Sequence, residues 1–214
     1  IRDAQESRGL GDVYKRQLLH YTGGESGMSN IYIEVDKNDL RYIQRKFREA
    51  PKNAKRVLRS AINQTATAAM KKIRKGGAAG YTIDRGAFKS QINVQRANLS
   101  HLDATIKSQG RPRTLQRFKH DVPSSAADIT KSGMKNIINS VGAKLFVASG
   151  GDADGRIVQR ETKKRYPLRV IVSNSVPKMV EKIYEGERGG QGDMQPFIEK
   201  TLHEKVMEQV EKVL

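Results

Sequence analysis

The chain has 214 residues, of which 36% are hydrophobic and 29% charged, and its mean hydropathy is −0.66. The absence of cysteine excludes disulfide frameworks, thiolate metal sites and thiol nucleophiles, and no stretch approaches the roughly 18 apolar residues of a transmembrane helix. The formal net charge of +17 predicts that the protein lies beside a polyanion or an acidic partner surface.

Residues 1–27 show neither helical nor strand periodicity, and their four basic and four acidic side chains cancel. The segment resembles a translated sequencing-adaptor scar, and two glycine codons ahead of Glu25 can spell a ribosome-binding site just before Met28. We therefore expect residues 1–27 to be disordered, non-native upstream sequence. A genuine disordered arm is the alternative. Residues 28–214 are expected to form a single domain.

The first elements of this domain are a strand and two helices. Alternation of apolar and polar residues predicts a short strand at 31–36. Asn38 is expected to cap a helix from Asp39 to about Glu49. A second helix is predicted from Pro51 to about Lys75, with its end at the glycine-rich run 76–80. Small side chains dominate its apolar stripe, which predicts close packing against a sheet or another helix.

The rest of the chain combines short strands with two more helices. Strand character is found at 92–97, 102–108, 134–140, 143–148, 156–161 and 168–172. Residues 149–155 have the composition of a hairpin tip. A short helix is expected after Asn174 or Ser175, and a last helix begins near Pro196. The apolar stripe of this last helix is Ile198, Leu202, Val206, Val210 and Val213. These elements predict an α+β fold, in which a mainly antiparallel sheet is packed by a long N-terminal helix and a C-terminal helix.

Motifs for catalysis and metal binding are missing from the sequence. The four histidines stand apart from one another and from carboxylate clusters with metal-ligand spacing; they are His20, His101, His120 and His203. No nucleophile elbow or phosphate-binding loop is present. The segment 152–155 has a slight likeness to a calcium loop but lacks the later glutamate, so a plain hairpin tip is favoured. We expect no enzymatic activity, no cofactor and no metal.

Basic residues form the strongest functional signal. Residues 51–120 carry sixteen basic and two acidic side chains, whereas residues 181–214 carry five basic and eight acidic ones. The candidate DNA-proximal residues are Lys52, Arg56, Arg59, Arg111, Arg113, Arg117, Lys119, Lys163, Lys164 and Arg165. A further group at 71–75 is interpreted as favourable pairing of cations with the dipole at a helix C-terminus. Aromatic residues are scarce and no recognition-helix motif is evident, so we expect contact with the phosphate backbone and no reading of bases. A solvated surface is the alternative for each cluster.

Several short segments that follow one another in a consistent order carry a resemblance to a known family. They are Arg59-Ser60-Ala61-Ile62-Asn63, Tyr81-Thr82-Ile83, Ile92-Asn93-Val94, Leu115-Gln116-Arg117-Phe118, Leu145-Phe146-Val147-Ala148, Arg160, the run from Pro167 to Met179, and Pro196-Phe197-Ile198. The run from Pro167 to Met179 is the most specific of them. Through these segments the chain resembles, over about residues 30–214, the prophage minor tail protein Z family of long-tailed phages.

The resemblance implies a virion structural protein at the head-proximal end of the tail, where it completes the tail or helps to join it to the head. It implies an α+β fold and a ring of copies around the DNA channel, in contact with neighbouring tail and head–tail connector proteins. It also implies non-specific backbone contact with packaged DNA, no membrane, and a location in the virion tail after assembly in the host cytoplasm.

Two other classes stay open. A basic architectural nucleic-acid-binding protein would bind as a monomer with strong salt dependence. A phage-encoded hydrolase would need carboxylates or histidines that converge in a pocket.

Overall fold

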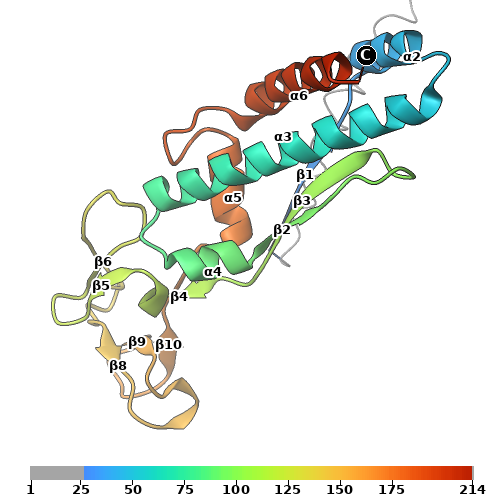
Figure 1. Cartoon of the computed structure of the whole chain (residues 1–214). Coiled ribbons are helices and arrows are strands. Elements are labelled where there is room, and N and C mark those ends of the chain that lie inside the picture. Colours follow the sequence, from blue (N-terminus) through green and yellow to red (C-terminus); the bar gives the residue numbers. More distant parts are fainter. Residues whose placement is uncertain (1–26, 214) are drawn as a thin grey trace, which may run out of the picture.

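The structure is a computed structural model and describes residues 27–213, so the expectation for residues 1–26 lies outside the described residues. The long helix α3 (Pro51–Gly80) runs along the main body (Figure 1). It contacts a three-stranded sheet on one side and helix α6 (Met194–Glu211) on another. The predicted α+β fold, with antiparallel strands packed by a long N-terminal helix and a C-terminal helix, is confirmed.

The main sheet has the strand order β1-β3-β2, and both pairings are antiparallel. Its strands are β1 (Met28–Glu34), β2 (Ile92–Gln95) and the central β3 (Asp103–Gln109). Ile106 lies opposite Ile31 on one side and Val94 on the other, so these three side chains share one face of the sheet. The register therefore gives the sheet an apolar face, and α3 packs against it.

Helix α2 (Lys37–Lys46) begins earlier than the sequence predicts. Asp36, and not Asn38, is the N-cap: its Oδ1 accepts hydrogen bonds from the backbone N–H groups of Asn38 at 2.7 Å and Asp39 at 2.8 Å. One carboxylate thus satisfies two N–H groups that have no partner within the helix, and its charge also suits the helix dipole. Ile43 and Phe47 are buried on the predicted face.

The predicted end of the long helix at Lys75 is wrong, because α3 continues through the glycine-rich run to Gly80. In this part of α3 the glycines allow neighbouring side chains to pack closely against the helix backbone. A Cβ on Gly76 would lie 2.6 Å from the side chain of Ile183, and one on Gly77 would lie 2.6 Å from the ring of Phe88. Two neighbouring segments therefore approach the helix backbone more closely than any side chain would allow.

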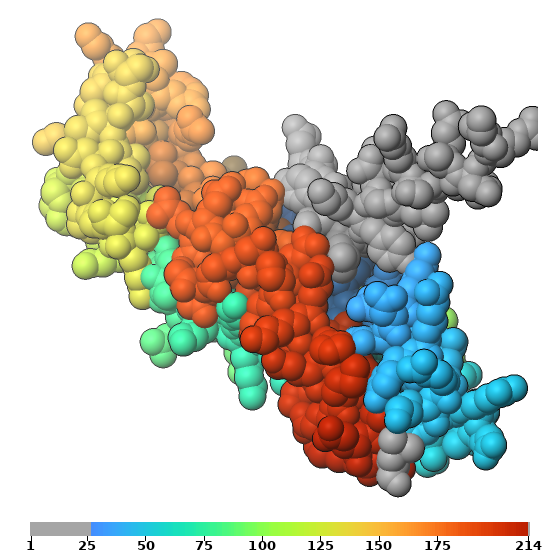
Figure 2. Space-filling view, turned by 90° about the horizontal axis from the view of Figure 1, so that it is seen from above, coloured from blue at the N-terminus to red at the C-terminus, as the bar shows by residue number. Residues whose placement is uncertain are grey.

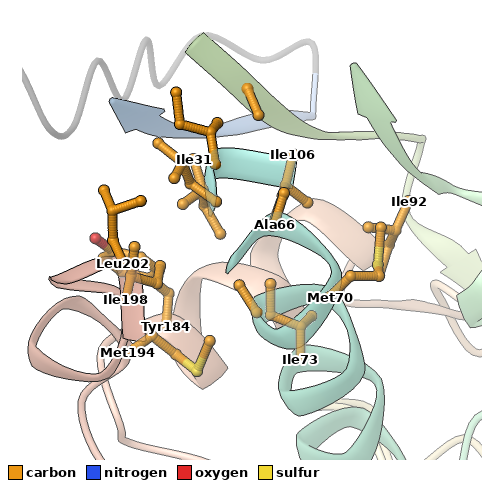
Figure 3. Packing of buried hydrophobic residues seen from close by; sticks show 14 of the residues in the cluster. Ile31, Ala66, Met70, Ile73, Ile92, Ile106, Tyr184, Met194, Ile198 and Leu202 are labelled. Carbon is orange, nitrogen blue, oxygen red and sulfur yellow. The ribbon is translucent and has the colours of Figure 1, made fainter. Parts of the chain in front are cut away.

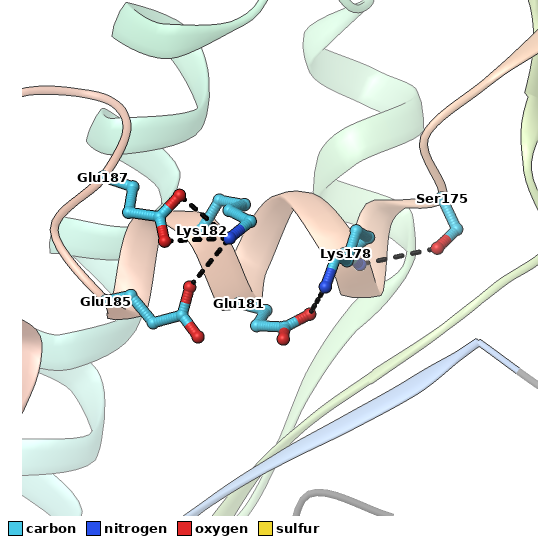
Figure 4. A network of polar contacts seen from close by, with 6 residues as sticks. All are labelled: Ser175, Lys178, Glu181, Lys182, Glu185 and Glu187. Carbon is cyan, nitrogen blue, oxygen red and sulfur yellow. Dashed lines mark hydrogen bonds and ion pairs between the residues drawn. The ribbon is translucent and has the colours of Figure 1, made fainter. Parts of the chain in front are cut away.

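Three further helices complete the fold. The short helix α4 (Arg85–Ser90) was not predicted, and it supplies Phe88. Helix α5 (Val176–Tyr184) is capped by Ser175, whose Oγ accepts from the backbone N–H of Lys178 at 3.4 Å (Figure 4). Helix α6 buries Ile198, Leu202, Val206 and Val210 as predicted. Val213 lies beyond the end of α6 and is 42% exposed, so its place in the stripe is wrong.

Residues 113–173 form a small β unit at one end of the molecule, away from α2 (Figures 1 and 2). Its strands are β4 (Arg113–Thr114), β5 (Lys119–Asp121), β6 (Ala126–Asp128), β7 (Lys135–Asn136), β8 (Phe146–Val147), β9 (Ile157–Arg160), β10 (Leu168–Val170) and β11 (Val172–Ser173). The strand predicted at 134–140 shrinks to two residues, and Ile138 is 51% exposed. The hairpin tip between β8 and β9 is confirmed, with Gly150 at a φ of 87°.

The core is divided between these two parts. The larger cluster joins α3 to the main sheet, α5 and α6, and Figure 3 shows Met70 and Ile73 of α3 among its members. Full burial of an isoleucine or methionine side chain stabilises the folded state by about 1.5–3 kcal/mol relative to leaving that side chain exposed. A smaller cluster of Leu115, Ala127, Leu145 and Ile157 lies in the β unit. The main body therefore provides a rigid frame for residues displayed on α3.

Candidate nucleic-acid interface

The ten candidate residues occupy three separate places. Lys52, Arg56 and Arg59 are exposed in the first half of α3. A second group flanks the 3-10 turn Leu115–Arg117; in it Arg111, Arg117 and Lys119 are exposed, whereas Arg113 is half-buried. A third group, Lys163, Lys164 and Arg165, lies in the exposed connection between β9 and β10.

These groups do not form one surface. The backbone of the second group is tied to the chain just beyond the end of α3: the Asp84 N–H donates to the Arg117 carbonyl at 3.3 Å. Lys52 stands near the start of α3, and a rise of 1.5 Å per residue puts it about 42 Å from Gly80. The third group lies in the β unit, at the end of the molecule away from α2 (Figure 1). A single short phosphate segment could not reach all three.

The structure instead forms a basic groove beside α3, made of three hollows that share lining residues. The first has a volume of about 650 Å³ and lies where α3 faces the end of β2 and one side chain of α6. Its basic lining residues are Arg59, Lys71, Arg96 and Lys205, and the rest of its lining is polar or small: Ser60, Asn63, Gln64, Thr67, Ala68, Ala97 and Asn98.

The groove continues toward the C-terminal end of α3. A hollow of about 290 Å³ shares Lys71 and Arg96 with the first and adds Arg74. A third hollow, of about 390 Å³, shares Arg74 and extends over α4. Its basic lining residues are Arg74, Lys75, Arg85 and Lys89. Among the residues that the structure describes, no carboxylate lines any of the three hollows.

Seven groove cations carry their charge without a compensating carboxylate. They are Arg59, Lys71, Arg74, Lys75, Arg85, Lys89 and Arg96, and none takes part in an ion pair within residues 27–213. The eighth, Lys205, pairs with Glu208. The dipole interpretation of residues 71–75 is wrong, because α3 extends past them and its last turn holds no basic residue. Lys72 differs from its neighbours, since its ammonium lies 4.0 Å from the ring centroid of Phe197 in α6.

Hydrogen bonds fix one wall of the groove. The Asn63 side chain bonds both backbone groups of Ala97, just past the end of β2. Arg96 donates from Nη1 to the Asn63 carbonyl at 3.4 Å and to Thr67 Oγ1 at 3.3 Å. Arg96 was not among the sequence candidates, and neither were Arg85 and Lys89. The excess of basic residues over 51–120 contained all three, but only the fold shows which of them face one another.

Residues 181–214 hold eight carboxylates, on α5, on α6 and in the connection between them, and several of these are paired locally. Lys182 bonds Glu185 at 3.2 Å and Glu187 at 2.8 Å, and Lys178 pairs with Glu181 (Figure 4). The Glu187 hydrogen bond raises the pKa of Lys182, and the reciprocal bond lowers the pKa of Glu187. The charge division seen in the sequence is therefore also a division between surfaces.

One histidine has a partner that the sequence did not suggest. His203 Nδ1 lies 2.9 Å from Oδ1 of the buried Asp39, joining α6 to α2. No third group hydrogen-bonds this histidine among the described residues, and the pair is a polar link between the two helices. Within residues 27–213 there is also no grouping of three or more His, Asp or Glu residues suited to a metal ion.

Comparison of the chain with protein-family models, curated proteins and solved structures finds no match. Among the helices that the structure describes, none has the length and apolar character required to cross a bilayer.

Proposed function

We propose that the protein is a virion structural component of a phage tail, a minor tail or tail-completion protein at the head-proximal end. In this role it assembles with copies of itself and with neighbouring tail and head–tail connector proteins around the DNA channel, and it acts without catalysis. The observation that supports the proposal most is the groove of seven unpaired cations, which suits a chain that stands next to packaged DNA.

Two further features support an assembly role. The sequence resembles the minor tail protein Z family over most of its length, and the α+β fold agrees with what that resemblance implies. In addition, the carboxylates of α5 and α6 lie on elements different from those that carry the seven unpaired groove cations. Copies can therefore meet through surfaces of opposite charge.

The direct test is to locate the chain in phage particles. Immunoelectron microscopy of a phage that carries this gene should label the junction of tail and head, and tailless heads from the same lysate serve as control. Particles that lack the chain, or that carry it only at the distal tail tip, would contradict the proposal.

A second test concerns the cluster beside the end of α3. Replacing Arg111, Arg113, Arg117 and Lys119 with alanine should lower the yield of infectious particles in a complementation assay, while folding and any ring seen by electron microscopy persist. Wild-type yield from this variant would remove the cluster from the mechanism and leave it as solvated surface.

A free-standing architectural nucleic-acid-binding protein is the second candidate. It is favoured by one observation: a single copy contains the whole groove. For this candidate the chain would coat DNA in the cell and be absent from purified particles, so the labelling experiment separates the two.

A further inference from the structure

We infer that the basic groove along α3 binds the phosphate backbone of one strand of double-helical DNA, without reading its sequence. The inference deepens the proposed function, on which it rests for the presence of duplex DNA beside the chain. It assigns the contact to Arg59, Lys71, Arg74, Lys75, Arg85, Lys89 and Arg96, of which only Arg59 was a candidate from the sequence.

The length of the groove fits this partner. Arg59 and Lys75 are sixteen residues apart on one continuous helix, which corresponds to about 24 Å. One strand of B-DNA presents a phosphate about every 3.4 Å along the axis, so this span contains about seven phosphates of that strand. The strand turns once in about 10 base pairs, so about half of these phosphates face one side of the duplex, and the seven unpaired cations are sufficient to neutralise them.

The chemistry of the lining favours a phosphate backbone over a protein partner. Between the cations stand hydroxyl and amide side chains, Ser60, Asn63, Gln64 and Thr67, which are residue types that contact phosphate oxygens. A protein interface of this size would be expected to have aromatic or aliphatic anchors at its centre. The hollow of about 650 Å³ has no such anchor among the described residues. The only residues in its lining with a wholly apolar side chain are Ala68 and Ala97.

The lining also favours a duplex over a single strand. Binding of single strands depends on bases that stack on exposed aromatic rings. The one aromatic side chain in the groove, Phe88, is 5% exposed because it packs against Gly77. The groove also has apolar lining residues such as Met70 and Ile83, but among the described residues it presents no ring for stacking. Its charges and hydrogen-bonding groups can be satisfied by the backbone of a duplex.

The experiment compares two triple variants of the full chain with equal loss of charge. The groove variant carries Arg59→Ala, Lys71→Ala and Lys75→Ala, which are exposed positions on α3 where alanine favours the helix. The control carries Lys163→Ala, Lys164→Ala and Arg165→Ala in the exposed β9–β10 connection. Thermal melting first establishes that both are folded.

Fluorescence anisotropy with a duplex of about two helical turns then measures affinity from low to high salt. The groove variant should bind at least about tenfold more weakly near 0.1 M salt. Its slope of log affinity against log salt should fall by about 2.7, since each lost phosphate contact removes about 0.9. The control should stay within about threefold of the unmodified chain, because charges beyond the Debye length are screened.

Several results would overturn the inference. Equal losses in the two variants would show that net charge alone attracts DNA, and absence of salt-dependent binding by the unmodified chain would exclude a DNA site. Tighter binding of a single strand, or equal binding of polyglutamate, would assign the groove to another anion. Each outcome is independent of the particle-labelling test. A chain that binds duplex through the groove yet is absent from virions would refute the proposed function alone.

Discussion

The side-chain amide of Asn63 in α3 forms two hydrogen bonds with the backbone of Ala97, beyond the end of β2. Asn63 Nδ2 donates to the Ala97 carbonyl at 3.0 Å, and the Ala97 N–H donates to Asn63 Oδ1 at 2.9 Å. The amide thus takes the place of a neighbouring strand at a point where the ladder with β3 has ended. It connects α3 to the chain that carries Arg96, and so holds a wall of the basic groove.

Asn63→Ala should therefore lower the free energy of unfolding by about 1–3 kcal/mol, because two backbone groups of the buried Ala97 lose their partners. Urea denaturation measures the change. Gln64→Ala is the matched control, since its amide bonds only Ser60 Oγ on the same helix, and it should be close to neutral. Equal effects would mean that the Ala97 backbone finds water instead. Groove binding of DNA should also weaken in Asn63→Ala, because the chain that carries Arg96 loses its attachment to α3.

Gly77→Ala should destabilise the protein although alanine favours helices by about 1 kcal/mol. The added methyl would lie 2.6 Å from the Phe88 ring, and α4 would have to shift. Gly86→Ala is the control, because a Cβ there meets nothing closer than 3.6 Å. It should be neutral or slightly stabilising.

A double-mutant cycle tests the cause. In the Gly77→Ala background, Phe88→Leu should cost less than it does alone, with a coupling of about 1 kcal/mol or more. Strict additivity of the two changes would show that the glycine is needed for some other reason than contact with Phe88.

Leu58→Asp and Arg59→Ala test the phase of α3 with adjacent residues. Leu58 is 4% exposed in the main core, so an unpaired carboxylate there should cost about 3–5 kcal/mol. Arg59 is exposed, and its replacement should leave stability within about 0.5 kcal/mol. Chemical denaturation of both variants gives the comparison. Similar losses would mean that the buried face of the helix is misassigned.

Because of Tyr184, we expect the free energy of unfolding to fall at alkaline pH. Burial, aided by the charges of Asp193 and Glu199, raises its pKa from 10.0 to about 12. The folded state thus favours the neutral phenol, and its advantage is complete below pH 10 and lost as the pH rises toward 12. The contribution of this shift to the free energy of unfolding is about 3 kcal/mol.

Denaturation between pH 9 and about 12 should show a smaller decline for Tyr184→Phe than for the unmodified chain. Tyr166→Phe, at a residue that is 63% exposed, is the control and should follow the unmodified chain. Tyrosinate absorbance during the titration provides a second readout. An unchanged alkaline decline in Tyr184→Phe would place the sensitivity elsewhere.

Much of the fold could be predicted because its causes are local. The stripe of Ile198, Leu202, Val206 and Val210 predicted α6, and the glycines and aspartates of 149–155 predicted the tip between β8 and β9. Ser175 was one of two residues proposed to cap α5, and it is the one that does so. Each of these patterns lies within a few consecutive residues.

The predicted end of α3 was wrong because a run of glycines can either end a helix or allow other segments to pack closely against it. In isolation it ends a helix, since glycine is the poorest helix former after proline. In the folded chain Gly76 and Gly77 remain helical. Glycine is needed at these two positions because the side chains of Ile183 and Phe88 occupy the space that a Cβ would require. The partner at 183 is more than a hundred residues away, so no local pattern contained it.

The sequence by itself determined the charge of this protein, its α+β class and the apolar faces of its long helices. The tertiary structure alone decided which cations act together. Arg59 and Lys71 come into one groove with Arg96 through the packing of β2 beside α3, whereas Lys52 and Lys163 are carried to distant places. The physical reason is that charge and periodicity are properties of short segments. A binding surface depends on distances between segments, which only packing sets.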